Sequence, residues 1–194
     1  MKKGFTLIEL LVVIAILAIL ATVIVVIINP GELLKQARDT TRISDLAAIN
    51  SAIALYLSDV TTPYLKNGAA CTAGTHYGTV AVSTSTPFAV AGNVLAATGV
   101  TTSVSGAGWV SVNFTSISSG SPLARLPMDP QNTTTYYYAY GCGTGTLNGD
   151  LSYEVNAKME STKYSAGGGG DVVSNVKDGG DNATWYEIGN NLTQ

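Results

Sequence analysis

Residues 10–28 form an apolar run of nineteen residues in which Thr22 is the single polar member. As an α-helix the run would be about 28 Å long, which matches the hydrocarbon thickness of a bilayer. Lys2 and Lys3 precede it, and the positive-inside rule keeps them in the cytoplasm. The sequence therefore predicts a membrane-spanning helix, with the rest of the chain outside the inner membrane.

A cleavable secretory signal is the competing interpretation of this N-terminus. Such a signal has a shorter apolar region and ends in an A-x-A-like site. The alanines of the run are Ala15, Ala18 and Ala21, so it contains no A-x-A site. This spacing favours a retained membrane helix.

Glu9 places a carboxylate at the cytoplasmic edge of the apolar run, in the sequence GFTLIELL. A charged side chain within a membrane helix costs about 2.5–3.5 kcal/mol near the centre and less near the interface. Such residues pair with a partner in most cases, so Glu9 is a candidate functional residue. The alternative is an interfacial acid that is simply hydrated.

The sequence KKGFTLIE, followed by the uninterrupted apolar helix, resembles the signal of type IV prepilins and pseudopilins. The resemblance is close over residues 1–28. It implies that a prepilin peptidase cuts after Gly4, removes a leader of residues 1–4, and methylates the new amine on Phe5. It also implies that Glu9 pairs with the N-terminal amine of a neighbouring subunit during assembly.

A stagger between neighbouring helices would bring Glu9 to this amine. Cleavage creates a cation on Phe5, and methylation of an amine keeps its charge. Phe5 and Glu9 are four residues apart, so pairing within one subunit is an open alternative.

A second helix is predicted after Asn29-Pro30-Gly31. Pro30 removes a backbone donor and Gly31 is a poor helix former, so a kink or local melting is expected at these two residues. Residues 32–58 have helical composition, with apolar residues recurring at three and four, and a soluble domain is expected to pack on this stripe. The opposite face carries five charged residues, with Lys35–Asp39 and Arg42–Asp45 expected as neighbours: Lys35, Arg38, Asp39, Arg42 and Asp45.

Residues 5–58 are thus expected to form one bent helical spine, transmembrane at 7–28 and amphipathic at 32–58. Residues 59–194 are expected to form the globular domain. The long helix resembles the spine of the type IV pilin fold. The expected class is therefore α+β, with the N-terminal α-helical spine packed against a C-terminal antiparallel β-sheet domain.

Alternation and turn residues predict a β-rich globular part. Strands are expected at 79–86, 109–117, 135–140 and 152–159, and a short helix at 88–98. The turn before the last strand is expected at 147–150, because Asn148-Gly149 suits a hairpin. The LP-x-DP sequence at 126–130, followed by a Tyr-rich strand, a turn and a second strand, resembles pseudopilins and many pilins.

Cys71 and Cys142 are the two cysteines, and both are expected outside the membrane. An even pair in an oxidising compartment favours a disulfide. It would close a loop of about 70 residues. Two free thiols are the alternative where the host lacks an oxidative folding system.

The stretch SAGGGGDVVSNVKDGG, residues 165–180, is expected to be a flexible loop. Five residues in or beside the loop could supply oxygen ligands to Ca²⁺, which takes six to eight of them: Asp171, Asp178 and Asp181, with Asn182 and Glu187. Major pseudopilins carry a calcium site in a C-terminal acidic loop, but this loop departs from their dense acidic pattern. A solvated polar loop without a cofactor is the competing interpretation, and the weaker acidic pattern favours it.

The sequence contains no catalytic constellation. His76 is the single histidine, so transition-metal sites and histidine-dependent triads lack ligands or a base. Ten Lys plus Arg against thirteen Asp plus Glu, without a basic block, give no support to a nucleic-acid-binding surface. The chain is therefore interpreted as a structural protein and not as an enzyme.

The resemblance implies a homo-oligomeric helical filament. Its partners would be the prepilin peptidase, the inner-membrane assembly platform and minor pilins, with DNA or surfaces as ligands of the filament. The subunit would lie in the inner membrane before assembly and in an extracellular pilus afterwards, for adhesion, twitching motility or DNA uptake. A pseudopilin of a type II secretion or competence system is one alternative, and a non-polymerising, membrane-anchored extracellular binding domain is another.

Overall fold

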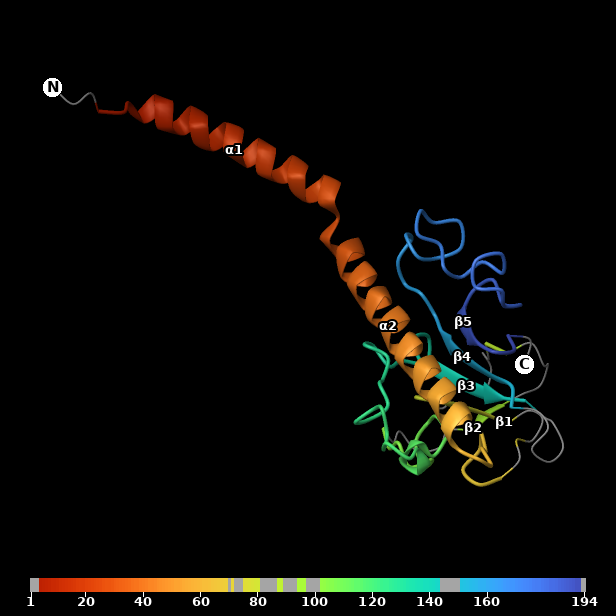
Figure 1. Cartoon of the computed structure of the whole chain (residues 1–194). Coiled ribbons are helices and arrows are strands. Elements are labelled where there is room, and N and C mark those ends of the chain that lie inside the picture. The colour runs from red at the N-terminus through yellow and green to blue at the C-terminus, as the bar shows by residue number, and fades with distance from the viewer. Residues whose placement is uncertain are drawn as a thin grey trace.

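The computed structural model describes residues 4–69, 71, 75–80, 87–88, 94–96, 102–143 and 151–192. A long N-terminal helical segment leads into a domain in which one helix lies along a twisted sheet (Figure 1). Helix α1 (Leu7–Ile28) projects away from the domain, and α2 (Pro30–Asp59) runs along it. The predicted α+β class, a long N-terminal helix followed by an antiparallel sheet domain, is confirmed.

Helix α1 is apolar around its whole circumference and buries none of its residues. The N-terminal helical segment contains a stretch that is long and apolar enough to cross a membrane, by length and composition. An α-helix satisfies its own backbone hydrogen bonds, so such a segment is stable in lipid, where water cannot serve as a partner.

Within the described residues, the sheet has five strands in the order β2-β1-β3-β4-β5. β1 and β2 pair in parallel, and the other three pairs are antiparallel. The strands are β1 (Thr75–Gly78), β2 (Val94–Ala96), β3 (Tyr138–Cys142), β4 (Tyr153–Ala157) and β5 (Tyr186–Gly189).

The main core lies between α2 and one face of the sheet. Leu46, Ile49 and Ile53 are fully buried on α2, at the spacing that places side chains on one face of a helix. They pack in one cluster with Tyr140 of β3 and Val155 of β4. The apolar stripe predicted for α2 therefore does face the domain.

The other face of the sheet is covered as well. Phe88, Tyr137, Ala139 and Trp185 form a second buried cluster there. All five residues of both β3 and β4 are buried as a result. The polar residues that alternate along β4, Glu154 and Asn156, are thus enclosed.

The predicted strand at 109–117 is wrong. This segment is irregular and ends in a 3₁₀-helix, η1 (Phe114–Ser116). Trp109, Val110 and Val112 are all buried in the main core, and the indole Nε1 of Trp109 donates to the carbonyl of Pro127 at 2.9 Å. The segment fills the core instead of pairing in the sheet, so its alternating pattern does not correspond to an inner and an outer face.

The structure also moves other predicted elements. Strand β3 begins three residues later than predicted, because Thr133 and Tyr136 first close a turn through two hydrogen bonds. Residues 94–96, predicted as part of a helix, form β2. Of the strand predicted at 79–86, residues 79–80 form a bend after β1, and residues 81–86 lie outside the described residues, as does the turn predicted at 147–150.

Cys71 and Cys142 form a disulfide with a Cα–Cα distance of 5.9 Å. The predicted pairing is confirmed. The bond connects the segment before β1 to the end of β3.

Candidate functional site

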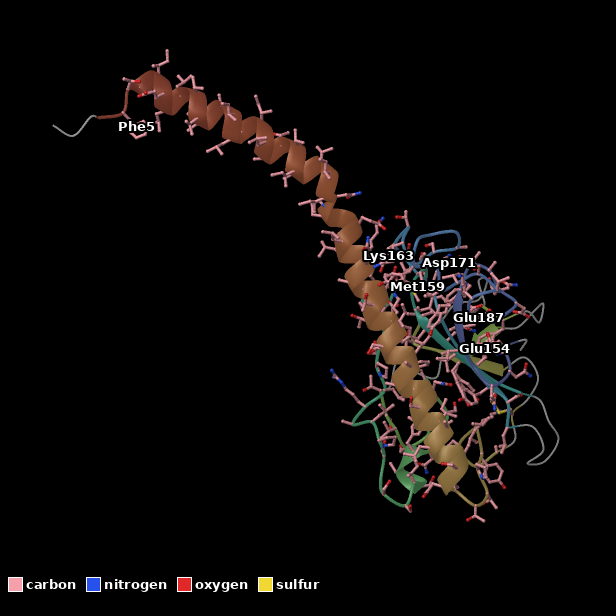
Figure 2. All side chains as sticks on the ribbon, turned by 45° about the horizontal axis from the view of Figure 1, so that its top comes forward. Phe5, Glu154, Met159, Lys163, Asp171 and Glu187 are labelled. Carbon is pink, nitrogen blue, oxygen red and sulfur yellow. A yellow bond between two sulfur atoms is a disulfide. The ribbon has the colours of Figure 1, made fainter. Side chains whose placement is uncertain are left out.

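The segment in front of α1 is exposed. Gly4, Phe5 and Thr6 precede the helix in a non-helical conformation, and Phe5 is 88% exposed. A Cβ atom added to Gly4 would have no neighbour within 4 Å. The fold therefore does not require a glycine here, and the Gly4–Phe5 bond is open to an enzyme at the end of the molecule farthest from the domain (Figure 2).

Thr6 and Glu9 form a capping box at the start of α1. The backbone N–H of Glu9 donates to Thr6 Oγ1 at 3.3 Å, and Glu9 Oε2 accepts from the N–H and the hydroxyl of Thr6, both at 2.8 Å. The carboxylate is thereby folded back toward the N-terminus, where the helix dipole favours a negative charge. Both hydrogen bonds use the same oxygen, which leaves Oε1 for another partner.

Phe5 and Glu9 also share a shallow hollow on the side of α1. Phe5, Ile8, Glu9, Val12 and Val13 line it, and its volume is about 390 Å³. Apart from the Glu9 carboxylate its walls are apolar. The two residues that the prepilin resemblance singles out are therefore adjacent on one surface of the helix.

The break between the helices lies at Asn29, one residue before the predicted pair Pro30 and Gly31. Asn29 has φ 45° and ψ 74°, a left-handed conformation that asparagine tolerates better than most residues, and it ends α1 while capping α2. Its side chain accepts from the N–H of Glu32 at 3.4 Å. Pro30 then occupies the first turn of α2, where a missing N–H costs nothing.

A buried charge cluster attaches the first half of α2 to the domain; we call it the α2 charge cluster. Its members are Arg38, Asp39 and Arg42 of α2, Asp129 of the LP-x-DP sequence, and Glu160 after β4.

Arg42 is the centre of the α2 charge cluster. Its Nη1 lies 2.8 Å from Asp39 Oδ1 and 2.5 Å from Glu160 Oε1, while its Nε and Nη2 donate to Asp129. Burial alone would lower the pKa of Arg42, but the hydrogen bonds that it donates to Asp129, Glu160 and Asp39 raise it above its ordinary value. The guanidinium is thus a permanent buried cation surrounded by carboxylates.

The carboxylates of α2 also hold the segment after β4. Asp39 accepts from the N–H groups of Glu160 and Ser161 at 2.8–3.1 Å. Glu32 accepts from the N–H and the hydroxyl of Thr162 at 2.6 and 2.8 Å. Backbone donors that would otherwise lack a partner are therefore satisfied from α2.

The structure corrects the predicted charge pairs of α2. Lys35 pairs with Glu32 and not with Asp39, and Arg42 pairs with Asp39 and not with Asp45. Asp45 accepts from the Tyr138 hydroxyl at 2.8 Å. The prediction that these charged residues lie on the face opposite to the domain is wrong, because Asp39 and Arg42 are buried against the domain.

The outer face of α2, which is turned away from the sheet, is uncharged between residues 37 and 58. Its exposed members are small or aliphatic: Ala37, Thr40, Thr41, Ser44, Ala47, Ala48, Ser51, Ala54, Leu55 and Ser58. The hydroxyls of Thr40, Thr41 and Ser51 donate to the carbonyls four residues earlier at 2.8–3.2 Å. These donors are satisfied within the helix, so the outer face of α2 can be covered without leaving them unpaired.

The three aspartates predicted for Ca²⁺ are not gathered around one point. Asp171 accepts from the N–H groups of Gly167, Val173 and Ser174 at 2.9–3.0 Å, and these bonds hold the pKa of its carboxyl well below its usual range. Asp178 accepts from the N–H of Gly180 and from that of Glu187 in β5, and Asp181 is exposed. In the part of the chain that the structure describes, no three His, Cys, Asp or Glu residues are grouped to hold a metal ion. A calcium site stays a prediction.

A comparison with protein families identifies the N-terminal segment. The prokaryotic N-terminal methylation motif matches residues 1–25, which cover the leader and most of α1. The N-terminus is therefore a prepilin signal of the type IV pilin or pseudopilin type. No curated protein and no solved structure matches the chain.

Proteins that bear this motif form a structural rather than a catalytic family. The motif implies, in general, processing by a prepilin peptidase and assembly into filaments. Together with α1 it fits anchoring in the membrane before assembly.

Thr6 is the functional residue that the sequence reasoning missed. The signal for it was present, because T-L-I-E in front of an apolar run is a capping-box pattern. The sequence predicts Asp39 and Arg42 on a charged helix face, whereas the structure places both in the buried α2 charge cluster.

Proposed function

We propose that the chain is the structural subunit of a type IV pilus. It is cleaved after Gly4, N-methylated at Phe5 and polymerised through its N-terminal helix into a surface filament for adhesion, twitching motility or DNA uptake. The observation that carries the proposal is that α1 buries none of its 22 residues, while its first turn holds a carboxylate directly behind the prepilin cleavage point.

The apolar side chains of α1 are stable only where lipid or another protein surface shields them from water. Each Val, Leu or Ile side chain left in water forgoes about 1.5–3 kcal/mol of burial free energy. Lipid supplies the cover before assembly, and the helices of neighbouring copies supply it in a filament. Glu9 and the N-terminal cation of Phe5 then compensate each other's charge in this apolar setting.

The outer face of α2 supports the same reading. It carries small side chains and no charge, and its bonded hydroxyls point back to their own helix. Small residues allow helices to approach closely, so this face suits contact with helices of further copies. The assembly platform and minor pilins are the partners expected during that process.

The test is mass spectrometry of the N-terminus of the protein in filaments sheared from the cell surface. We expect abundant chain that begins at N-methylated Phe5. A Gly4→Ser variant is the matched control: its added atoms have room in the fold, so it should accumulate as folded precursor in the inner membrane.

Two results would replace the proposal. Processed chain found in the inner membrane alone would indicate a pseudopilin or a minor subunit. Wild-type chain that still begins at Met1 would indicate a membrane-anchored domain that does not polymerise.

A further inference from the structure

Two carboxyl groups are buried side by side on the far face of the sheet, which is the face turned away from α2. Glu154 of β4 is 0% exposed and Glu187 of β5 is 2% exposed. Both residues are labelled in Figure 2. Tyr153 and Val155 point to the opposite face and belong to the main core. In the register of β4 and β5, Asn156 lies opposite Glu187, and Glu154 is its diagonal neighbour.

The turn at 178–182 closes directly over the Glu187 carboxyl. The N–H of Asn182 donates to Glu187 Oε2 at 3.1 Å, and Asp178 accepts from the N–H of Gly180 at 3.0 Å. Gly180 lies so close to the carboxyl that a Cβ atom there would collide with it. Water is therefore kept from the pair by the backbone of the turn.

Two neighbouring side chains, Glu187 and Asn156, each have one oxygen that lacks a hydrogen-bond donor when both carboxyls are ionised. Glu187 Oε1 and Asn156 Oδ1 are buried without a hydrogen-bond partner, although Asn156 Nδ2 donates to Glu154 Oε1 at 2.6 Å. Buried acceptors without donors are rare, and two like charges in contact away from water repel strongly. A carboxylate cannot donate a hydrogen bond, whereas the neutral acid can.

We infer that Glu187 is a neutral carboxylic acid in the folded protein at neutral pH, that its Oε1–H donates to the Glu154 carboxylate, and that this shared proton locks the 178–182 turn onto the sheet. One proton then gives Glu187 Oε1 a hydrogen-bond partner and removes the repulsion between two ionised carboxyls; it does not supply a donor to Asn156 Oδ1. The inference concerns the domain alone and does not depend on filament assembly.

The surrounding groups agree with this assignment. Burial raises the pKa of Glu187 to about 9; the N–H of Asn182 acts in the opposite direction, and the charges of Glu154 and Asp178 add to the rise. Lys158 follows β4 directly, but its ammonium lies over the Trp185 ring, 6.0 Å from the centroid. The titratable groups that face Glu187 from β4 and from the turn, Glu154 and Asp178, are thus acidic. His76 of β1 lies in the same row of the sheet as Glu154, with Gly141 between them, and burial lowers its pKa to about 4, so its imidazole is neutral at pH 7.

A bound cation is the competing way to neutralise the pair. It would need further oxygen ligands, and the described residues hold no group of three acidic, His or Cys side chains placed for one. The proton requires none of them, so we assign the proton.

The first experiment is infrared spectroscopy of the full chain in detergent micelles at pH 7. We expect a protonated-carboxyl C=O band in the wild type, loss of that band in Glu187→Gln, and its retention in Asp181→Asn, which removes an exposed carboxylate from the same loop. A wild-type spectrum without the band, or a band that Glu187→Gln leaves unchanged, would overturn the inference.

The second experiment is unfolding in urea as a function of pH. Glu187 binds a proton in the folded state and releases it on unfolding between its ordinary pKa of 4.5 and about 9. As the pH rises through this window, its contribution should therefore raise the unfolding equilibrium constant by about tenfold per pH unit. Glu187→Gln keeps the size and the donor but does not titrate, so it should lack this slope, while Asp181→Asn keeps it.

The cation hypothesis gives the opposite pattern. Glu187→Gln would then weaken the domain at every pH, and Ca²⁺ would raise the urea midpoint of the wild type but not of the variant. That result would replace the proton by a metal ion.

Discussion

Arg42 and Asp129 meet as a bidentate ion pair across 87 residues of sequence. Nε lies 2.6 Å from Oδ2 and Nη2 lies 2.9 Å from Oδ1, and both side chains are 0% exposed. Asp129 also accepts from the N–H groups of Gln131 and Asn132, which shapes the turn after the LP-x-DP sequence. The position of α2 on the domain is therefore set by a directional charge contact as well as by apolar packing.

Replacing Asp129 by alanine should destabilise the domain severely. The change leaves Arg42 buried with one carboxylate fewer, and breaking a buried pair from one side costs about 3–5 kcal/mol. The measurement is urea unfolding of the full chain in detergent at pH 7. Arg125→Gln, which removes an exposed arginine, should stay within about 0.5 kcal/mol of the wild type. An Asp129→Ala loss below about 1 kcal/mol would mean that Arg42 finds other compensation.

Glu160 should make the free energy of unfolding of the domain fall at acidic pH. Burial alone would raise its pKa, but the hydrogen bonds from Arg38 and Arg42 lower it below the ordinary value of 4.5. Its stabilising contribution is therefore complete above about pH 4.5 and is lost as the pH falls through the lower, folded-state pKa. Glu160→Gln should be less stable at pH 7 and should lose less stability on acidification. If the free energy of unfolding fell equally with acidification in the wild type and in Glu160→Gln, the prediction would be contradicted.

Glu9→Ala should permit cleavage and methylation but impair assembly. The substitution leaves the Gly4–Phe5 bond exposed and removes the carboxylate that compensates the N-terminal cation in an apolar setting. We expect the yield of sheared filaments to fall by about tenfold or more, because losing about 1.4 kcal/mol at each subunit contact weakens each association step about tenfold. Thr22→Val is the control, because Thr22 is polar but bonded to Ala18 within α1, and it should assemble normally. A normal filament yield from Glu9→Ala would reject the role given to Glu9.

Removing the disulfide should lower stability by about 4 kcal/mol, the chain-entropy value for a loop of this size. Cys71 and Cys142 are separated by 71 residues, so the bond restricts a large part of the unfolded domain. The double variant Cys71→Ser/Cys142→Ser, compared with the oxidised wild type in urea, measures the effect. Reduction of the wild type should reproduce it, and a midpoint that neither treatment changes would show that the bond is not stabilising.

The sequence predicted best what depends on neighbouring residues. The prepilin signal and α1 lie within one contiguous stretch, and their properties are read from its apolarity and the placement of Gly4, Phe5 and Glu9. The helical period of residues 32–58 likewise locates α2 and its apolar stripe. Such features need no knowledge of what packs against them.

The failures share a physical cause in long-range contacts. Periodicity shows that Asp39 and Arg42 share a side of α2, but their partners Asp129 and Glu160 lie 87 or more residues away. The alternation of Glu154 and Asn156 is typical of a solvent-facing row, yet the second cluster and the 178–182 turn enclose them. A polar side chain in a strand is exposed or buried according to what a distant segment does.

Asn29 and the contacts that follow it define how a mechanical load would pass through the molecule. Since α1 buries no residue against the domain, a pull on the anchor enters through Asn29 into α2. The first side chains to bear it are Glu32, bonded to Thr162, and Arg38, bonded to Glu160, followed by Arg42 at the turn of Asp129. The force is thus distributed in shear along the helix over several charged contacts before it reaches any strand of the sheet.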